Sequence, residues 1–383
     1  MIGFDLTDEQ KQFRDLAHDF AEREMRPAAA EYDESEEYPW EVLRKAQEVG
    51  LLAYCVPEEY GGAGLASGLT GCIISEELFW GCAGMGTAMS GAMLAAYPIM
   101  LLGNAEQKAR YLPWFTDPRR LRLGAFALTE PGAGSDAASI TTTARRDGDS
   151  YVLNGRKCFI TNGGIADLYV VFATVDRSLG AGGITAFIVE GGWPGIVAGK
   201  KERKMGIRAS HTGDVVFEDV RVPAENRLGE EGWGFLGAMR FFDHSRPIVA
   251  SGGIGIARAA LEFAREYSLQ RQQFGRPIGK FQAISFLLAD MATEVEAARL
   301  LTWQAAWLGD HDRPCTKEAS MAKSFAGRTA MRVTTDAVQI LGGYGYMRDY
   351  PVEKWMRDAK VTQIYEGTEQ IQKLVISRLM LEG

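Results

Sequence analysis

The sequence predicts an α+β protein of several domains. We expect an N-terminal helical domain at residues 1–120, a middle antiparallel β-barrel or β-sandwich at residues 121–233, and a C-terminal four-helix-like bundle at residues 234–383. Apolar residues recur at helical spacing toward both ends of the chain, whereas short runs rich in β-branched residues occupy the middle. A length of 383 residues, 46% hydrophobic and 24% charged, suffices for several cores of a globular protein.

The first 120 residues contain clear helix signals. Residues Thr7 to Gln10 form a capping-box pattern, and apolar residues follow at helical spacing until Pro27. A second helix is predicted from Trp40 to Val49, with Gly50 as its stop. A turn-rich linker covers 57–64, helices resume near Thr70, and a short helix at 106–115 ends at Asp117-Pro118.

The stretch from Leu78 to Ala105 carries no charge and is long enough to cross a bilayer. Several glycines and Pro98 interrupt it, and no basic residues flank it, so buried helices of a globular protein are favoured over a membrane span. Its small residues, with Met85, Met89 and Met93, can line an acyl pocket, although methionines at such spacing are more often plain core.

The middle of the chain predicts strands at 123–128, 151–153, 157–160, 169–175, 184–189, 215–217 and 220–222. Asn154-Gly155 is the strongest local signal, because a two-residue type I′ hairpin turn requires positive φ at both positions. We therefore expect a hairpin there. From Gly234 onward the chain is predicted to be helical, most clearly at 283–308 and 321–341, with Gly342-Gly343 as a C-terminal cap.

Charge and composition exclude several classes of function. A net charge of −8 argues against binding to nucleic acid or to an anionic membrane, so any phosphate site must be a local basic cluster. The five cysteines and four histidines show no zinc or disulfide spacing, so no metal is expected. The segment from Met1 to Asp5 lacks the features of a signal peptide, and we expect a cytoplasmic protein.

One acidic residue near the carboxyl end is the strongest catalytic candidate. Glu366 lies between Ile364-Tyr365 and Gly367-Thr368, where the backbone can approach a ligand closely and a helix can start at Thr368. A partly desolvated carboxylate has a raised pKa and suits proton abstraction. The alternative is a solvated glutamate before a helix, which is the commoner situation.

Other segments combine residue types that suit a flat or phosphorylated ligand. The stretch 132–137 matches GxGxxA, but β-branched residues follow it, so no helix N-terminus is available for a dinucleotide and the Rossmann interpretation is rejected. Residues 159–164 and 339–345 offer an aromatic residue, hydroxyls and glycines, while Arg271, Phe274 and the Asp243–Pro247 segment supply cations and a ring. Ordinary loops, strand ends and helix ends are the alternative for each.

Taken together, these segments resemble the acyl-CoA dehydrogenase family, in particular its short- and medium-chain branch. The resemblance runs nearly end to end and includes the family's order of helical, β and helical domains. Its motifs are LTEPGAGSD at 128–136, FITNG at 159–163, RQQFG at 271–275, QILGG at 339–343 and IYEGT at 364–368.

The resemblance implies an FAD enzyme that acts on an acyl-CoA thioester as a homotetramer and passes electrons to an electron-transfer flavoprotein. It places the following residues along FAD in the same subunit: Phe126, Leu128, Thr129, Gly134, Ser135, Phe159, Ile160, Thr161, Thr368 and Gln370. It assigns a further set to a neighbouring subunit's cofactor: Arg271, Phe274, Gln339, Leu341, Gly342 and Gly343.

The resemblance also implies roles at the substrate. Glu366 removes the α-proton, and its backbone amide helps to polarise the thioester carbonyl. Ser135, Tyr365 and Gly367 contact the substrate, while Asp243 and Arg246 meet the nucleotide end of coenzyme A. Ser245 stands where isovaleryl- and long-chain members carry the base, so Glu366 is expected to act alone. Phe126 and Phe159 replace a tyrosine and a tryptophan that are common in the family.

Several rival functions remain open from the sequence. An acyl-CoA oxidase shares the flavin step but usually has a further domain, a nitroalkane-oxidase-like enzyme prefers aspartate at position 366, and a monooxygenase of this fold lacks the carboxylate. A catalytically silent scaffold that binds coenzyme A thioesters is the alternative from another class. Straight, branched and cyclic monoacyl chains are all compatible with the sequence, whereas a dicarboxylic substrate is disfavoured because 84–90 holds no charge.

Overall fold

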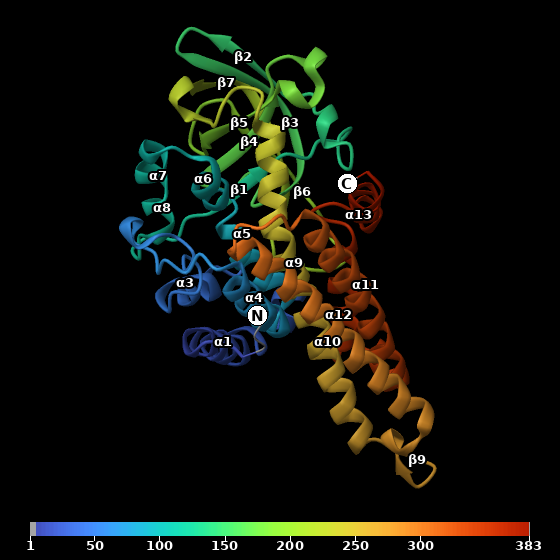
Figure 1. Ribbon diagram of the computed structural model, residues 1–383. Helices are drawn as coiled ribbons and strands as arrows, with labels where there is room; N and C mark the ends of the chain where they lie inside the picture. Colours follow the sequence, from blue (N-terminus) through green and yellow to red (C-terminus); the bar gives the residue numbers. More distant parts are fainter. Residues whose placement is uncertain (1–4, 383) are drawn as a thin grey trace.

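The computed structural model describes residues 5–382, so most of the Met1–Asp5 segment considered above lies outside the described residues. Helices form one end of the chain, a sheet follows, and long helices complete it (Figure 1). The predicted fold class is thus confirmed. The predicted boundaries at 120 and 233 fall in the connections before strand β1 and before helix α9.

The N-terminal helices begin and end where the sequence signals lie. The Thr7 hydroxyl oxygen accepts a hydrogen bond from the Gln10 backbone N–H at 3.2 Å, and the Gln10 side-chain oxygen accepts one from the Thr7 backbone N–H at 3.0 Å, which confirms the capping box. The helices are α1 (Asp8–Phe20), α2 (Ala29–Ser35), α3 (Trp40–Glu48), α4 (Gly68–Gly81), α5 (Ala83–Ala92), α6 (Ala96–Leu102), α7 (Ala105–Tyr111) and α8 (Pro113–Thr116).

The uncharged stretch from 78 to 105 forms the end of α4 and helices α5 and α6, which are largely buried, as predicted. By length and composition, one described helix, α9 (Gly234–Gln270), would suffice to span a membrane, and α5 with α6 would do so as a pair bent by 43°. The α9 window is 67% buried within the protein, which is typical of a core helix.

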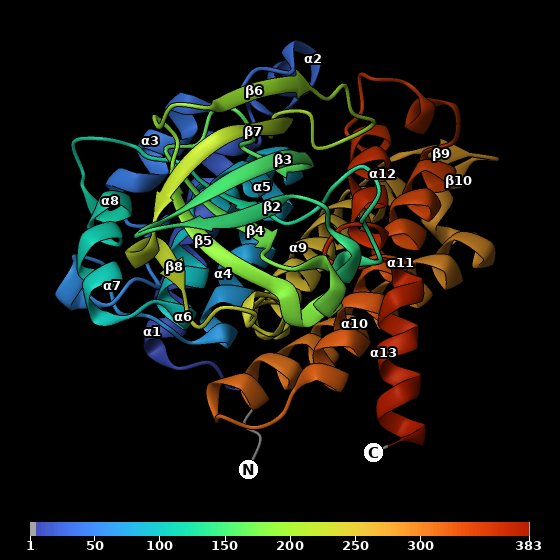
Figure 2. The ribbon, with the colours of Figure 1, turned by 90° about the horizontal axis from the view of Figure 1, so that it is seen from above.

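The middle domain is an eight-stranded sheet in the order β6-β7-β3-β2-β4-β5-β8, with β1 beside β4 (Figure 2). Most neighbours are antiparallel, but β1 and β2 both pair with β4 in parallel. The strands are β1 (Gly124–Ala127), β2 (Thr143–Asp147), β3 (Ser150–Thr161), β4 (Leu168–Thr174), β5 (Ile184–Glu190), β6 (Ile196–Lys201), β7 (Thr212–Pro223) and β8 (Arg227–Leu228).

Strand β4 is buried over its whole length because both faces of the sheet are covered. Leu168, Val170 and Phe172 pack into the core shared with the helices. Tyr169, Val171 and Ala173 pack into a second core on the opposite face. Burial on both faces accounts for the continuous apolar run, where a half-exposed strand would alternate.

The predicted hairpin at Asn154-Gly155 is wrong. Strand β3 runs straight through this dipeptide, and the turn to β2 lies at Gly148-Asp149, where Gly148 has a φ of +62°. At 154 the register with β7 shifts, and the Asn154 side chain exchanges two 2.9 Å hydrogen bonds with Asp219. The strands predicted at 215–217 and 220–222 are therefore one strand, β7. An Asn-Gly dipeptide is compatible with a β-bulge as well as with a hairpin turn. Here the pairing of β3 with β7 selects the bulge.

The C-terminal bundle contains α9, α10 (Gln282–Asp310), α11 (Thr316–Leu341), α12 (Val352–Ala359) and α13 (Glu369–Leu381). A short hairpin, β9 (Gln272–Gln273) and β10 (Arg276–Pro277), joins α9 to α10 at the end of the bundle remote from the sheet (Figure 1). Gly342 ends α11 with a φ of +62°, as its predicted cap role requires.

The segment Asp243–Pro247 lies inside α9, so this helix contains a proline. Proline there removes the N–H that would bond the Asp243 carbonyl, and the Cys315 thiol lies 3.9 Å from that oxygen. Packing against α4 and α11 keeps the helix continuous.

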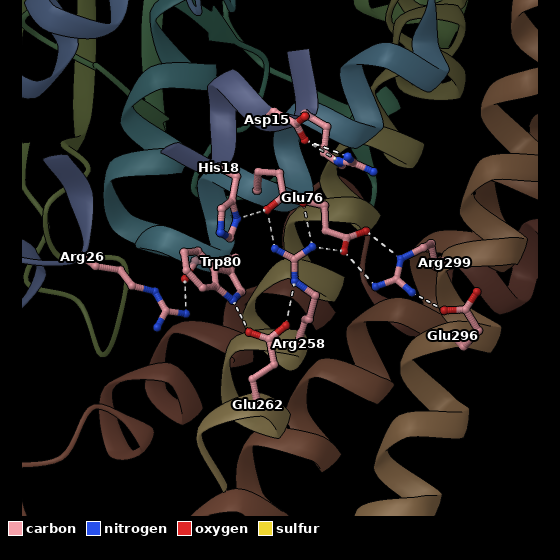
Figure 3. Close-up of polar contacts among 11 residues, drawn as sticks. Asp15, His18, Arg26, Glu76, Trp80, Arg258, Glu262, Glu296 and Arg299 are labelled. Atoms are coloured by element: carbon pink, nitrogen blue, oxygen red, sulfur yellow. Dashed lines mark hydrogen bonds and ion pairs between the residues drawn. The ribbon is translucent and has the colours of Figure 1, made fainter. Parts of the chain in front are cut away.

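A buried ion network fastens the N-terminal helices to the bundle (Figure 3). Arg258 on α9 donates to Glu76 and Glu77 of α4 at 2.8 Å each, and Arg299 of α10 donates to Glu76 at 2.9 and 3.0 Å. His18 of α1 lies 2.8 Å from Glu77. Both carboxylates expose about 6% of their side chains, so each relies on these partners.

We expect Arg258→Met to lower the free energy of unfolding by about 3–5 kcal/mol, because it leaves two buried carboxylates short of a partner. Urea denaturation measures the change. Arg265→Met on the same helix is the matched control, since Arg265 pairs with Glu266 at an exposed site and its loss should cost at most about 0.5 kcal/mol. Equal costs for the two variants would contradict a structural role for the network.

Candidate active site

Glu366 lies in a tight turn between α12 and α13. Glu366 has a φ of +51° and Gly367 a φ of +91°, so two successive residues adopt the left-handed region. A Cβ on residue 367 would come within 2.7 Å of the Gln372 side-chain nitrogen, which explains the glycine. The Thr368 side chain then accepts from the Ile371 amide and starts α13, as predicted.

The Glu366 side chain is half-buried and hydrogen-bonded. Ser245 of α9 donates its hydroxyl to Glu366 Oε2 at 2.8 Å. Burial raises the pKa of Glu366, while the Ser245 hydrogen bond and the charges of Arg246 and Lys323 act in the opposite direction. The structure therefore excludes the interpretation of Glu366 as a solvated surface charge.

The turn also exposes a hydrogen-bond donor. Within residues 5–382, the Glu366 backbone N–H has no acceptor. Both carbonyl oxygens of the turn, in contrast, are occupied by side chains. Gln372 donates to the oxygens of Glu366 and Gly367 at 3.1 and 3.0 Å, and Lys323 of α11 donates to that of Gly367 at 2.6 Å. The N–H groups of Gly367 and Thr368 have no acceptor among the described residues either. The turn thus leaves the Glu366 N–H available beside a carboxylate, as an oxyanion-binding site requires.

Arg246 and Asp243, predicted to meet the nucleotide end of coenzyme A, lie on α9 next to the Glu366 turn. Arg246 is only 5% exposed, and its Nε lies 3.4 Å from the Glu366 carbonyl oxygen. Asp243 is half-buried, lies 3.6 Å from Arg246 and accepts a 2.6 Å hydrogen bond from Thr316. The Arg246 guanidinium thus also contacts the Glu366 turn, and the role of both residues at coenzyme A stays a prediction.

On the sheet side, a buried ion pair positions the loop after β1. Lys157 is fully buried and donates to Glu130 Oε1 at 2.8 Å and to the Leu128 carbonyl at 2.9 Å. The Cys158 amide donates to the Thr129 carbonyl at 3.0 Å. The predicted residues of the two β segments therefore come together: Leu128, Thr129, Gly134, Ser135, Phe159, Ile160 and Thr161.

Members of this group differ in exposure. Leu128 and Ile160 are buried and shape the strands, whereas Ser135 is exposed and Phe159 is 66% exposed with a φ of +56°. An added Cβ at Gly134 would meet no atom within 4 Å, so the loop backbone is open to a ligand. An exposed aromatic ring beside an open backbone is a surface on which a flat ligand can stack.

Aromatic packing links the sheet to the turn. Phe126 of β1 stacks on Phe241 of α9, with ring centroids 4.8 Å apart, and lies 5.7 Å from Phe242. The Arg246 guanidinium lies 5.5 Å from the Phe242 ring. Phe126 is therefore separated from the Glu366 turn by two side chains. Gln370 is exposed on the first turn of α13, and Tyr365 is half-buried.

A second group of predicted residues lies elsewhere. Phe274 is 93% exposed in the β9–β10 hairpin, and Arg271 lies 5.4 Å from the Tyr344 ring. Gln339, Gly342 and Gly343 are exposed at the end of α11, while Leu341 is buried. The hairpin is remote from the sheet (Figure 1), so a single chain does not bring these residues to Glu366.

Comparison with known proteins identifies this arrangement. Models of the N-terminal, middle and C-terminal domains of acyl-CoA dehydrogenases match residues 7–117, 125–220 and 232–381. The chain belongs to the acyl-CoA dehydrogenase family. It is therefore an oxidoreductase, and the resemblance found in the sequence is confirmed.

Individual members of the family are similar over their whole length. The short-chain specific acyl-CoA dehydrogenase of Megasphaera elsdenii is 49% identical over 99% of this chain and 100% of its own. The structure of butyryl-CoA dehydrogenase from that organism has a TM-score of 0.96, at 49% identity over 99% of this chain and 100% of that one. A chain from "Electron transferring flavoprotein of Acidaminococcus fermentans" has the same TM-score and identity and covers 100% of both chains.

The family uses FAD, and the residues present fit that group. Exposed Phe159 offers a ring for stacking, the open backbone at Gly132–Gly134 offers close approach, and Ser135 and Thr161 offer hydroxyls. Phe at positions 126 and 159 keeps an aromatic ring in both places where the family often has tyrosine or tryptophan.

Sequence reasoning missed three residues at the turn: Lys323, Gln372 and, as a direct partner of Glu366, Ser245. The sequence contained one signal that could have identified Lys323. Lys323 falls on the face of α11 that Ala319, Ala322 and Ala326 bury, and a lysine on an apolar helix face needs a partner.

Lys157→Met should destabilise the protein by about 3–5 kcal/mol at pH 7, because Glu130 would be buried without its cation. Burial raises the pKa of Glu130, but Lys157 and the Thr141 and Thr142 hydrogen bonds lower it to about 2. The stabilisation is thus complete above about pH 4.5 and is lost as the pH falls toward 2.

Urea denaturation of wild type and Lys157→Met between pH 7 and pH 3 measures this difference, which should shrink at low pH. Lys200→Met, at an exposed pair with Glu202, is the control and should show almost no effect at any pH. A cost for Lys157→Met that is constant with pH would exclude Glu130 as the cause.

Proposed function

We propose that this protein catalyses the FAD-dependent α,β-dehydrogenation of an acyl-CoA thioester to the trans-2-enoyl-CoA. One observation carries the proposal: a half-buried carboxylate, that of Glu366, lies in a turn where the Glu366 N–H is unoccupied among the described residues. A base and an oxyanion donor in one turn suit proton removal next to a thioester carbonyl.

The residues of the chain have separate tasks in this reaction. The Glu366 N–H donates to the thioester oxygen as negative charge develops there, which acidifies the α-carbon. Glu366 takes the α-proton, and its raised pKa makes it a stronger base than an exposed glutamate. Ser245 keeps the carboxylate oriented through its 2.8 Å hydrogen bond. Bound FAD would supply the acceptor for the hydrogen that leaves the β-carbon as hydride.

A short, uncharged acyl chain is the best supported substrate. A cavity of about 20 Å³ lies beside α9, with Met89, Met93, Tyr97 and Ile248 in its wall. Ile248, in the cavity wall, lies one helical turn after Ser245, which is the partner of the Glu366 carboxylate. The volume is that of about one water molecule, and the flexible methionines allow limited widening. The names of the similar short-chain and butyryl-CoA enzymes support the same conclusion.

We further propose a homotetramer in which Arg271, Phe274 and residues 339–343 of one subunit complete the cofactor site of another. The exposure of Phe274 at 93% and Tyr346 at 80% supports an interface at this end of the bundle. Electron transfer to an electron-transfer flavoprotein is supported by the 49% identical chain from the Acidaminococcus fermentans structure. Five free, buried cysteines suit a reducing, cytoplasmic location.

Glu366→Gln should keep the fold, because the amide can still accept from Ser245, but should lower the rate at least a hundredfold, or about 10²–10⁴. The measurement is anaerobic bleaching of the yellow protein by butyryl-CoA. Glu266→Gln, at an exposed site on α9, is the control and should bleach at the wild-type rate. Normal bleaching by Glu366→Gln would overturn the assignment of the base, and a failure of wild type to bleach with any acyl-CoA would favour a silent scaffold.

We expect butyryl-CoA to bleach the protein faster than octanoyl-CoA, because the cavity beside Ile248 is small. Met89→Ala and Met93→Ala, which enlarge it, should raise the rate for octanoyl-CoA relative to butyryl-CoA. Stopped-flow rates for a panel of acyl-CoAs test this order. Unchanged selectivity in both variants would show that the acyl chain lies elsewhere, and oxygen consumption in place of dye reduction would identify an oxidase.

A further inference from the structure

Lys323 is a buried cation that the reaction outlined above does not use. It is 1% exposed, although it stands on α11 among alanines. Among the described residues, the Gly367 carbonyl oxygen is the one hydrogen-bond acceptor of its Nζ, at 2.6 Å. A buried ammonium group with a single neutral acceptor is costly, so its position calls for a nearby negative charge.

Two pairs of oppositely charged side chains lie around the Glu366 turn. On α9, Arg246 lies 3.6 Å from Asp243. On α13, Glu369 lies 2.7 Å from Lys373. Tyr365 is the remaining titratable group of the turn, and burial together with the Glu366 charge keeps its phenol neutral by raising its pKa. Among the described residues, neither Lys323 nor Glu366 forms an ion pair within 4 Å. Arg246 and Lys323 are the two cations that lower the pKa of Glu366, and Glu366 is the leading charge that raises the pKa of Lys323.

Lys323 acts on Glu366 indirectly, through the backbone of the Glu366–Gly367 turn. Its hydrogen bond fixes the Gly367 carbonyl, and Glu366 and Gly367 have φ values of +51° and +91°. A non-glycine residue in the left-handed region is strained and persists only where its surroundings enforce that conformation. Gln372 and Arg246 contribute hydrogen bonds to the same turn, but Lys323 adds an unpaired positive charge.

We propose that Lys323 is a positioning residue for the catalytic base: it fixes the Glu366–Gly367 turn through the Gly367 carbonyl and, together with Arg246, favours the ionised form of the half-buried Glu366 carboxylate. The proposal rests on the proposed role of Glu366. It implies that the lysine is needed even though it touches neither substrate nor cofactor.

The protonation equilibria of the two groups depend on each other. Burial lowers the pKa of Lys323 to about 8, and the Glu366 charge counteracts this, while Arg246 adds to it. Burial raises the pKa of Glu366, and the Lys323 charge is one of three influences that oppose the rise. Removing the ammonium therefore raises the pKa of Glu366 further, so that the base becomes protonated, and inactive, at a higher pH.

The experiment compares Lys323→Met, which removes charge and donor, with Lys323→Gln, which removes the charge and keeps a donor. We expect both to move the acid limb of kcat/KM for butyryl-CoA upward by about one pH unit. Lys204→Met is the matched control: Lys204 also donates to a backbone oxygen, that of Ser210, at 2.6 Å, and burial likewise lowers its pKa to about 8. Its acid limb should coincide with that of the wild type.

An infrared titration of the Glu366 carboxyl, as the wild-type spectrum minus that of Glu366→Gln, measures the same pKa without turnover. The same subtraction in the Lys323 backgrounds should give the same upward shift. Unshifted titrations in both Lys323 variants would overturn the proposal, as would a wild-type acid limb in Lys323→Gln. If Glu366→Gln turned over normally, the proposed function would fail, yet the infrared titration would still report whether Lys323 controls Glu366.

Discussion

The site depends on one physical constraint: a carboxylate must be kept out of water and still be ionised. The Glu366 turn meets it by converging donors from three helices. Ser245 of α9 bonds the carboxylate, and Lys323 of α11 and Gln372 of α13 bond the turn's carbonyl oxygens. These helices are far apart in the sequence. Glu366 therefore gains its hydrogen-bond partners only when the bundle is assembled.

The rest of the fold serves to place that turn against the sheet. The Arg258 network fixes α4 against α9 and α10, and α4 contributes Ile74 and Ser75 to the wall of the small cavity near Ser245. The Lys157–Glu130 pair fixes the loop after β1 beside Phe159. A buried ion network thus fixes the helices, and a buried ion pair fixes the loop. Such pairs are poor sources of net stability, but leaving either one incomplete is expensive, and this favours a single arrangement.

Local signals succeeded where neighbours in sequence decide the outcome. The cap at Thr7, the stop at Gly342 and the apolar run of β4 depend on residues within a few positions, so they were readable. Asn154-Gly155 failed because two structures, a hairpin turn and a bulge, use the same residues, and pairing with β7 selected the bulge. Pro247 does not end α9, because tertiary packing keeps the helix continuous through it.

The sequence by itself determined the order of the three domains, the family and the identity of the candidate base, because each is written in contiguous motifs with their own spacing. Only the tertiary structure decided that Arg246 lies beneath Glu366 and that Lys323 and Ser245 are its partners. Such contacts join residues more than forty positions apart. A local sequence pattern does not specify the hydrogen-bond partner of a buried polar side chain, because that partner depends on how the helices pack.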